Sequence, residues 1–128
     1  MKKQAGLWID HRETVLVLIQ GDSTETKHIA SDLEKHVRFS GGNRTEDGAA
    51  DDQRDRRFAA HLERYYDEVI AHLGGVDSIL LLGPGEAKGE FEKRLGIQGL
   101  GAHVVGVEAA DKMTERQVAA KVRGYFGP

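Results

Sequence analysis

Cysteine is missing from the 128 residues of the chain, and its absence excludes disulfide bonds, zinc sites with cysteine ligands and thiol catalysis. Long apolar runs are missing as well, since none approaches the roughly 18 residues that a membrane-spanning helix needs. The stretch after Met1 is charged at Lys2, Lys3 and Asp10, too soon for the apolar region of a secretory signal. These absences make the cytoplasm the expected location.

A strong positive charge is also missing. Lysine and arginine total 18 against 21 aspartates and glutamates, which gives a formal net charge of -3. A field of that sign provides no long-range attraction to nucleic acid, so any RNA contact has to come from a local patch. The length is that of one domain with one core, and residues 1–128 are therefore expected to form a single domain.

Apolar patterns predict the elements of this domain. Two runs of aliphatic and β-branched residues, at 5–9 and 14–19, flank a polar connection and predict a hairpin, and a looser alternation at 24–30 predicts a third, more exposed strand. Further along, the patterns predict helices at about 58–73, 86–95 and 114–126, and buried strands at 76–82 and 103–107. The order β-β-β-α-β-α-β-α predicts an α/β fold, a ribonuclease H-like mixed sheet with helices on its faces.

A polar stretch from about 35 to 55 lacks both helical and strand periodicity and predicts a long loop. Loops of this length are uncommon in compact domains and are usually functional or disordered. Gly41 and Gly42 permit backbone conformations that other residues avoid. Four arginines in the loop and beside it are candidates for phosphate contacts: Arg38, Arg44, Arg54 and Arg56. Interleaved acids offset part of that charge, so an RNA-binding loop and a disordered surface loop are both open interpretations.

Three segments carry a resemblance to a known family. They are Trp8-Ile9-Asp10-His11-Arg12-Glu13, Gly83-Pro84-Gly85-Glu86-Ala87-Lys88, and Val107-Glu108 with Lys112-Met113-Thr114. Together with the element order, they resemble the middle domain of the class 1 release factor and Pelota family of eukaryotes and archaea, and especially its small bacterial relatives. The resemblance covers nearly the whole chain. It marks Asp10, His11, Arg12, Gly83 and Gly85 as family-motif positions.

The resemblance implies a role in translation. In release factors of this family, the loop after the third strand carries Gly-Gly-Gln, enters the ribosomal peptidyl-transferase centre and promotes peptidyl-tRNA hydrolysis; Ser40-Gly41-Gly42-Asn43 occupies that place here. Pelota-type relatives lack the motif and act on stalled ribosomes without releasing the peptide. The implied function is ribosome or tRNA binding by a protein without a codon-recognition domain. Peptidyl-tRNA hydrolysis through Gly41, Gly42 and Asn43 is the enzymatic alternative, with the Asn43 backbone N–H stabilising the oxyanion.

Other chemistries have weaker support in the sequence. Asp10 ends the first strand, where a ribonuclease H-like nuclease keeps a metal-binding carboxylate, but no acid follows the strand at 76–82 until Glu86. The histidines show no ligand spacing, so neither a metal nor another cofactor is expected. Gly83-Pro84-Gly85 with Lys88 fits either an RNA phosphate site at a helix N-terminus or an ordinary tight turn, and the turn is favoured.

A protein-interaction module is the third class of function that the sequence allows. The edge of the exposed strand at 24–30 could pair with another chain, and the aromatic pair Tyr65-Tyr66 could form a contact surface. Either feature would support a homodimer.

Overall fold

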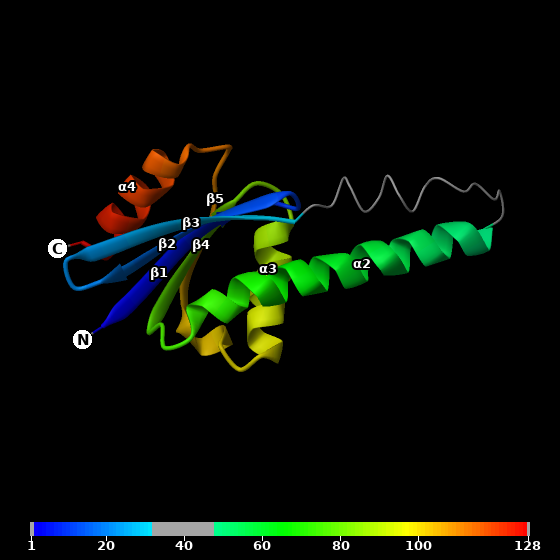
Figure 1. Ribbon diagram of the computed structural model, residues 1–128, viewed down its shortest axis with the longest axis horizontal. Helices are drawn as coiled ribbons and strands as arrows, with labels where there is room; N and C mark the ends of the chain where they lie inside the picture. The colour runs from blue at the N-terminus through cyan, green and yellow to red at the C-terminus, as the bar shows by residue number, and fades with distance from the viewer. Residues whose placement is uncertain (1, 32–47, 128) are drawn as a thin grey trace.

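A mixed five-stranded sheet organises the chain (Figure 1). The computed structural model describes the backbone of residues 2–31 and 48–127 and the side chains of residues 2–31 and 56–127. The strand order is β3-β2-β1-β4-β5. The first three strands form an antiparallel meander, and β4 and β5 run parallel to β1. The strands are β1 (Lys3–Ile9), β2 (Glu13–Gln20), β3 (Ser23–Ala30), β4 (Ser78–Gly83) and β5 (Val104–Ala109).

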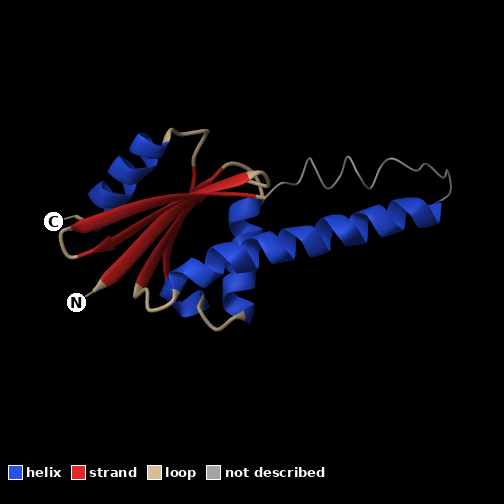
Figure 2. Ribbon diagram, viewed as in Figure 1, coloured by secondary structure: helices blue, strands red, loops and turns tan. Residues whose placement is uncertain are grey.

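Helices cover both faces of the sheet (Figure 2). One face carries α2 (Gly48–Ile70), which continues into the 3-10 turn η1 (Ala71–Leu73), together with α3 (Ala87–Ile97). The other face carries α4 (Glu115–Phe126), and the 3-10 turn η2 (Gly101–His103) leads into β5. The predicted α/β fold and its element order are confirmed. In the described part of the chain, no helix combines the length and apolarity needed to cross a membrane.

The continuous apolar run of β4 is explained by burial on both faces. Leu81 belongs to the core under α2 and α3, where it shares a cluster with Phe91, whereas its neighbour Leu80 belongs to the core under α4 with Val118. Successive side chains of a strand point to opposite faces, so a strand covered on both sides is apolar throughout.

Close packing of α4 depends on a glycine in β1. A Cβ atom at Gly6 would overlap the two Cγ atoms of Val122, a fully buried residue of α4. Only a residue without a side chain lets the helix lie this near the strand. The glycine inside an otherwise apolar strand therefore marks the place where α4 is seated.

The predicted loop over 35–55 is wrong at its C-terminal end, because α2 already begins at Gly48. Residues 48–57 contain no proline and no glycine beyond Gly48, and they include Ala49 and Ala50, which have high helix propensity. Their lack of an apolar period follows from position, since this end of α2 projects past the sheet (Figure 1). This part of the helix has no sheet to pack against, so an apolar stripe would have nothing to bury it.

The predicted burial of the last strand is also wrong. β5 lies at an edge of the sheet, and its residues alternate between half-buried and exposed. Val105 is 48% exposed and Val107 is 40% exposed. The valines indicate a strand correctly, but an apolar run by itself does not distinguish an edge strand from an interior one.

Candidate functional site

The motif segments of the chain meet at one end of the sheet. Because β1 and β4 are parallel and adjacent, the turn after Ile9 and the turn after Gly83 leave from the same edge. The chain that follows β5 lies there too, with the Ala110 N–H donating to the Gly83 carbonyl at 3.0 Å. We call this end, formed by residues 10–13, 83–88 and 110–114, the carboxyl edge.

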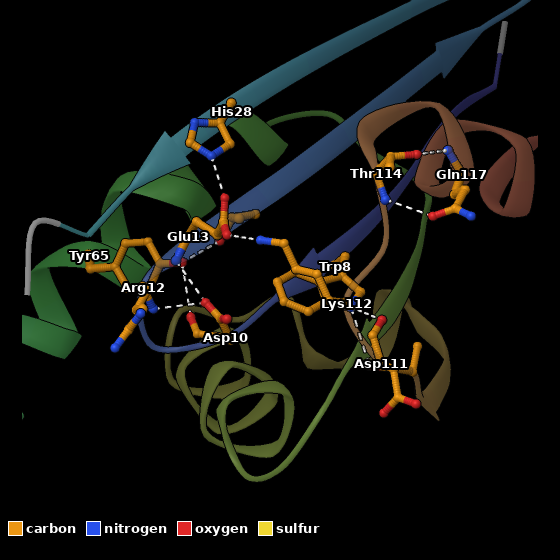
Figure 3. Close-up of polar contacts among 12 residues, drawn as sticks. Trp8, Asp10, Arg12, Glu13, His28, Tyr65, Asp111, Lys112, Thr114 and Gln117 are labelled. Atoms are coloured by element: carbon orange, nitrogen blue, oxygen red, sulfur yellow. Dashed lines mark hydrogen bonds and ion pairs between the residues drawn. The ribbon is translucent and has the colours of Figure 1, made fainter.

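Asp10 shapes the hairpin turn at the carboxyl edge. Its Oδ1 atom accepts the backbone N–H groups of Arg12 and Glu13, each at 2.8 Å (Figure 3). The Asp10 N–H donates to the Glu13 carbonyl at 3.1 Å, which closes the turn. Such an Asx turn is a structural use of the carboxylate. Among the described residues, no three histidines, aspartates or glutamates are grouped as metal ligands would be.

Tyr65 of α2 secures the same hairpin from the side of the helix. Its hydroxyl donates to the Asp10 carbonyl at 3.1 Å and is hydrogen-bonded to the Thr14 Oγ1 atom at 2.7 Å. Burial raises the pKa of Tyr65. Tyr65 and Tyr66 are only 2% and 3% exposed, so the prediction that this pair forms an interaction surface is wrong. Their positions on the apolar stripe of α2 place them in the core.

Glu90 of α3 joins the hairpin to both helices. Its Oε1 atom accepts the Tyr66 hydroxyl at 2.7 Å and lies 2.9 Å from the His11 Nε2 atom. Burial raises the pKa of Tyr66, and the hydrogen bond to Glu90 adds to the increase. The His11 ring also packs edge-to-face on Phe58 of α2, with ring centroids 5.9 Å apart. No local pattern in the sequence points to Glu90, because its contacts join elements that are distant along the chain.

Glu13 is the centre of a second cluster, on the face that carries α4. Its carboxylate lies 2.6 Å from the His28 Nε2 atom of β3 and accepts a hydrogen bond from the Lys112 ammonium (Figure 3). The hydrogen bond from Lys112, followed by the one from His28, holds the pKa of Glu13 below its usual range. Three segments that are far apart in the sequence are therefore joined through one carboxylate.

Trp8 links this cluster to the connection between β5 and α4. Its indole N–H donates to the Ala110 carbonyl at 3.2 Å and to the Asp111 carbonyl at 2.9 Å. The Lys112 ammonium lies 5.2 Å from the centre of the indole ring, within cation–π range. The Trp8 side chain thereby fixes the course of the chain past β5 and positions Lys112 toward Glu13.

The turn after β4 has its own structural reasons for glycine. Gly83 has a φ of +153°, and a Cβ atom there would overlap the Ile9 carbonyl oxygen of β1. Gly85 has a left-handed φ of +60°. The Lys88 ammonium donates to the Gly85 carbonyl at 2.6 Å, so this lysine closes the turn in the way a tight strand-to-helix connection requires.

The structure brings together some of the predicted site residues and leaves others undescribed. Asp10, His11, Arg12, Gly83, Gly85 and Lys88 all lie at the carboxyl edge. Arg56 is exposed on α2, and Arg54 lies on the same helix where only the backbone is described. The loop candidates lie outside the described residues: Arg38, Gly41, Gly42, Asn43 and Arg44.

The sheet order and the helices on both faces define an α/β domain of the ribonuclease H-like type. Among solved structures, the Thermoplasma acidophilum Pelota protein matches 96% of this chain with a TM-score of 0.59 and 19% identity. Archaeoglobus fulgidus Pelota matches 97% with a TM-score of 0.53 and 16% identity. The archaeal termination factor aRF1 matches 97% with 15% identity, but its TM-score of 0.47 is too low to support an argument.

These likenesses establish the fold, and they confirm the predicted resemblance to Pelota at that level. The chain spans 32% and 34% of the two Pelota chains, about a third of their length. No protein-family model matches the sequence. No curated protein matches it either.

Proposed function

We propose that the protein acts in translation and binds the ribosome or tRNA through residues 38–57 and the carboxyl edge. One observation carries the proposal: the chain shares its fold with Pelota proteins over nearly its whole length. The family that the sequence resembles works on ribosomes, which makes ribosomal RNA or tRNA the partner to test first.

The position of the carboxyl edge supports this proposal. The Ser31 N–H donates to the Arg12 carbonyl at 2.8 Å, and the Ser31 hydroxyl donates to the His11 carbonyl at 2.7 Å. The chain therefore leaves β3 for residues 32–47 directly beside the family-motif hairpin. Hydrogen bonds join this hairpin to α2 and α3 through Glu90, Tyr65 and Tyr66. The hairpin is therefore held in place by the rest of the domain.

Exposed arginines on α2 supply cationic side chains for phosphate contacts, within a helix that has four arginines and six acids. Arg56, Arg57 and Arg64 are exposed, and no carboxylate among the described side chains lies within ion-pair distance of them. Arginine in this state is suited to phosphate contacts, which dominate the affinity of proteins for nucleic acid. Arg56 and Arg57 belong to the N-terminal half of α2, and the N-terminal end of that helix projects past the sheet (Figure 1).

Co-sedimentation with purified ribosomes at low salt tests the proposal. We expect the wild-type protein to pellet with ribosomes, and the Gly41→Ala/Gly42→Ala variant to pellet several-fold less. Gly124→Ala is the matched control, because a Cβ atom there meets nothing within 4 Å. A wild-type protein that stays in the supernatant would show the proposal to be wrong.

A peptide-release assay separates binding from catalysis. Ribosomes carrying labelled peptidyl-tRNA report hydrolysis directly, and binding without release of the label identifies a binding protein. Release that is lost in Asn43→Pro, which removes the backbone N–H at this position, with binding kept, would instead identify the enzymatic alternative.

A further inference from the structure

The two edges of the sheet differ in how well they are protected against pairing with another strand. β3 carries charged side chains along its length, among them Glu25 and Lys27, and charges of this kind discourage strand addition. β5 has the sequence Val-Val-Gly-Val-Glu-Ala, without lysine or proline. The edge strand that its apolar sequence predicts to be buried is therefore the less protected of the two.

The backbone of β5 presents hydrogen-bonding groups to the outside. Ala110 donates toward β4, so in a parallel pair Gly106 and Glu108 bond to β4 as well, while the residues between them face away. Those outward residues are Val107 and Ala109, and Val105 is the extra residue where the register of β5 against β4 shifts. The Tyr125 hydroxyl reaches the Val105 carbonyl at 3.3 Å, as expected for a carbonyl on the open side.

We propose that the protein forms a homodimer in which β5 pairs antiparallel with β5 of a second copy, about a two-fold axis at Val107. In this register Val107 lies opposite its own symmetry mate, and Val105 lies opposite Ala109 of the second copy. Val107 then uses both its N–H and its C=O group. The exposed valines meet across the axis, and the two five-stranded sheets become one continuous sheet.

The surface beside β5 is complementary to itself under this symmetry. A groove of about 620 Å³ lies between α3 and Val107, with Glu86 and Lys93 among the residues that line it. Glu86 is the N-cap of α3 and Lys93 lies seven residues further on, so the two share a helix face. A two-fold axis reverses the helix direction, which brings Glu86 of one copy toward Lys93 of the other. Gly89 lies between them with nothing within 4 Å of where a Cβ atom would be, which leaves room for the second copy.

Sedimentation equilibrium on the whole protein tests the dimer. We expect twice the monomer mass at about 100 μM, a concentration that fills an interface with a micromolar Kd. Val107→Lys places a charge on the axis and should give a monomer with unchanged circular dichroism. Thr26→Lys places the same charge on the exposed strand β3 and should leave the dimer intact.

A cysteine cross-link tests the register independently of any destabilised variant. The chain has no cysteine, so Val107→Cys carries a single thiol. Facing residues of a hydrogen-bonded antiparallel pair have Cα atoms about 5.5 Å apart, which suits a disulfide. We expect mild oxidation to give a covalent dimer from Val107→Cys and none from Thr26→Cys. A monomeric wild type, or a dimer that Thr26→Lys dissociates and Val107→Lys does not, would overturn the proposal.

Discussion

Glu13 shows how much of the carboxyl edge depends on single side chains. Its carboxylate is 25% exposed and faces both Lys112 and His28, which come from opposite ends of the chain. Ion pairs in full contact with water contribute little to stability, about 0–1 kcal/mol, but partial burial and two hydrogen-bonding partners increase the contribution. Glu13 is therefore expected to be a measurable component of the stability of this domain.

The lowered pKa of Glu13 makes this contribution depend on pH. A carboxyl group whose pKa is lower in the folded state stabilises fully above its ordinary value of 4.5, and the stabilisation is lost as pH falls through the folded pKa. We therefore expect Glu13→Gln to lower the free energy of unfolding at neutral pH, and the gap to wild type to narrow below about pH 4.5. Urea denaturation of both proteins at several pH values between neutrality and below about pH 4.5 measures this difference in the free energy of unfolding. Asp22→Asn, in the exposed turn after β2, is the control, and a gap that stays constant with pH would contradict the prediction.

Tyr65 and Thr14 form a buried hydrogen-bonded pair that a double-mutant cycle can isolate. Thr14 is 0% exposed, so Tyr65→Phe leaves the Thr14 hydroxyl buried without the tyrosine hydroxyl as its partner. This change should lower the free energy of unfolding by about 1–3 kcal/mol. Adding Thr14→Val removes the abandoned hydroxyl. The double variant should then be more stable than the sum of the single effects predicts, by about 0.5–3 kcal/mol. Strict additivity in denaturant titrations would mean that the pair is not coupled.

At the scale of elements, the seating of α4 on β1 depends on the absence of a side chain at Gly6. Gly6→Ala introduces a methyl group into the space of Val122 and should destabilise the protein by about 1–3 kcal/mol. Val122→Ala in the same chain removes the overlapping atoms, so the double variant should recover part of the loss caused by Gly6→Ala. Thermal unfolding followed by circular dichroism measures both. Gly124→Ala, in the same helix but facing open space, should not destabilise.

Elements with strong local signals were predicted well. The capping box of α4 is present, with the Thr114 side chain accepting from the Gln117 N–H and the Gln117 side chain accepting from the Thr114 N–H (Figure 3). The first hairpin also follows from local sequence, since Asp10 makes its turn within four residues. The start of α2 and the edge position of β5 depend on which elements lie nearby, and local patterns contain no such information.

The candidate site was predictable to the same extent. Gly83, Gly85 and Asp10 can be recognised in the sequence, because a backbone conformation or a turn requires those residue types. Glu90 and Lys112 are ordinary surface-type residues in the sequence, and their roles arise only when the sheet brings β1, α3 and the segment after β5 together. Contacts between distant segments are the part that the sequence could not supply.

At the scale of the whole molecule, the proposed RNA contact is local and electrostatic. Each phosphate contact that is lost should reduce the slope of log K against log salt by about 0.7–0.9. Arg56→Gln/Arg57→Gln on the projecting part of α2 should therefore reduce the salt slope of ribosome binding by up to about 2. Ribosome-binding assays at several salt concentrations measure this slope. Arg116→Gln/Arg123→Gln on α4 changes the net charge equally and should leave the slope unchanged, so an equal effect of both pairs would point to net charge alone.

Trp8 gives the carboxyl edge an optical signal of its own. It is the single tryptophan of the chain, it is 1% exposed, and its indole contacts the chain segment that carries Lys112. Fluorescence excited at the red edge of indole absorption therefore comes from one known place, without labelling. A ligand that displaces Lys112 from the ring would change the quantum yield, while unfolding would shift the emission to longer wavelength. Binding at this edge and loss of the fold can thus be followed separately in one cuvette.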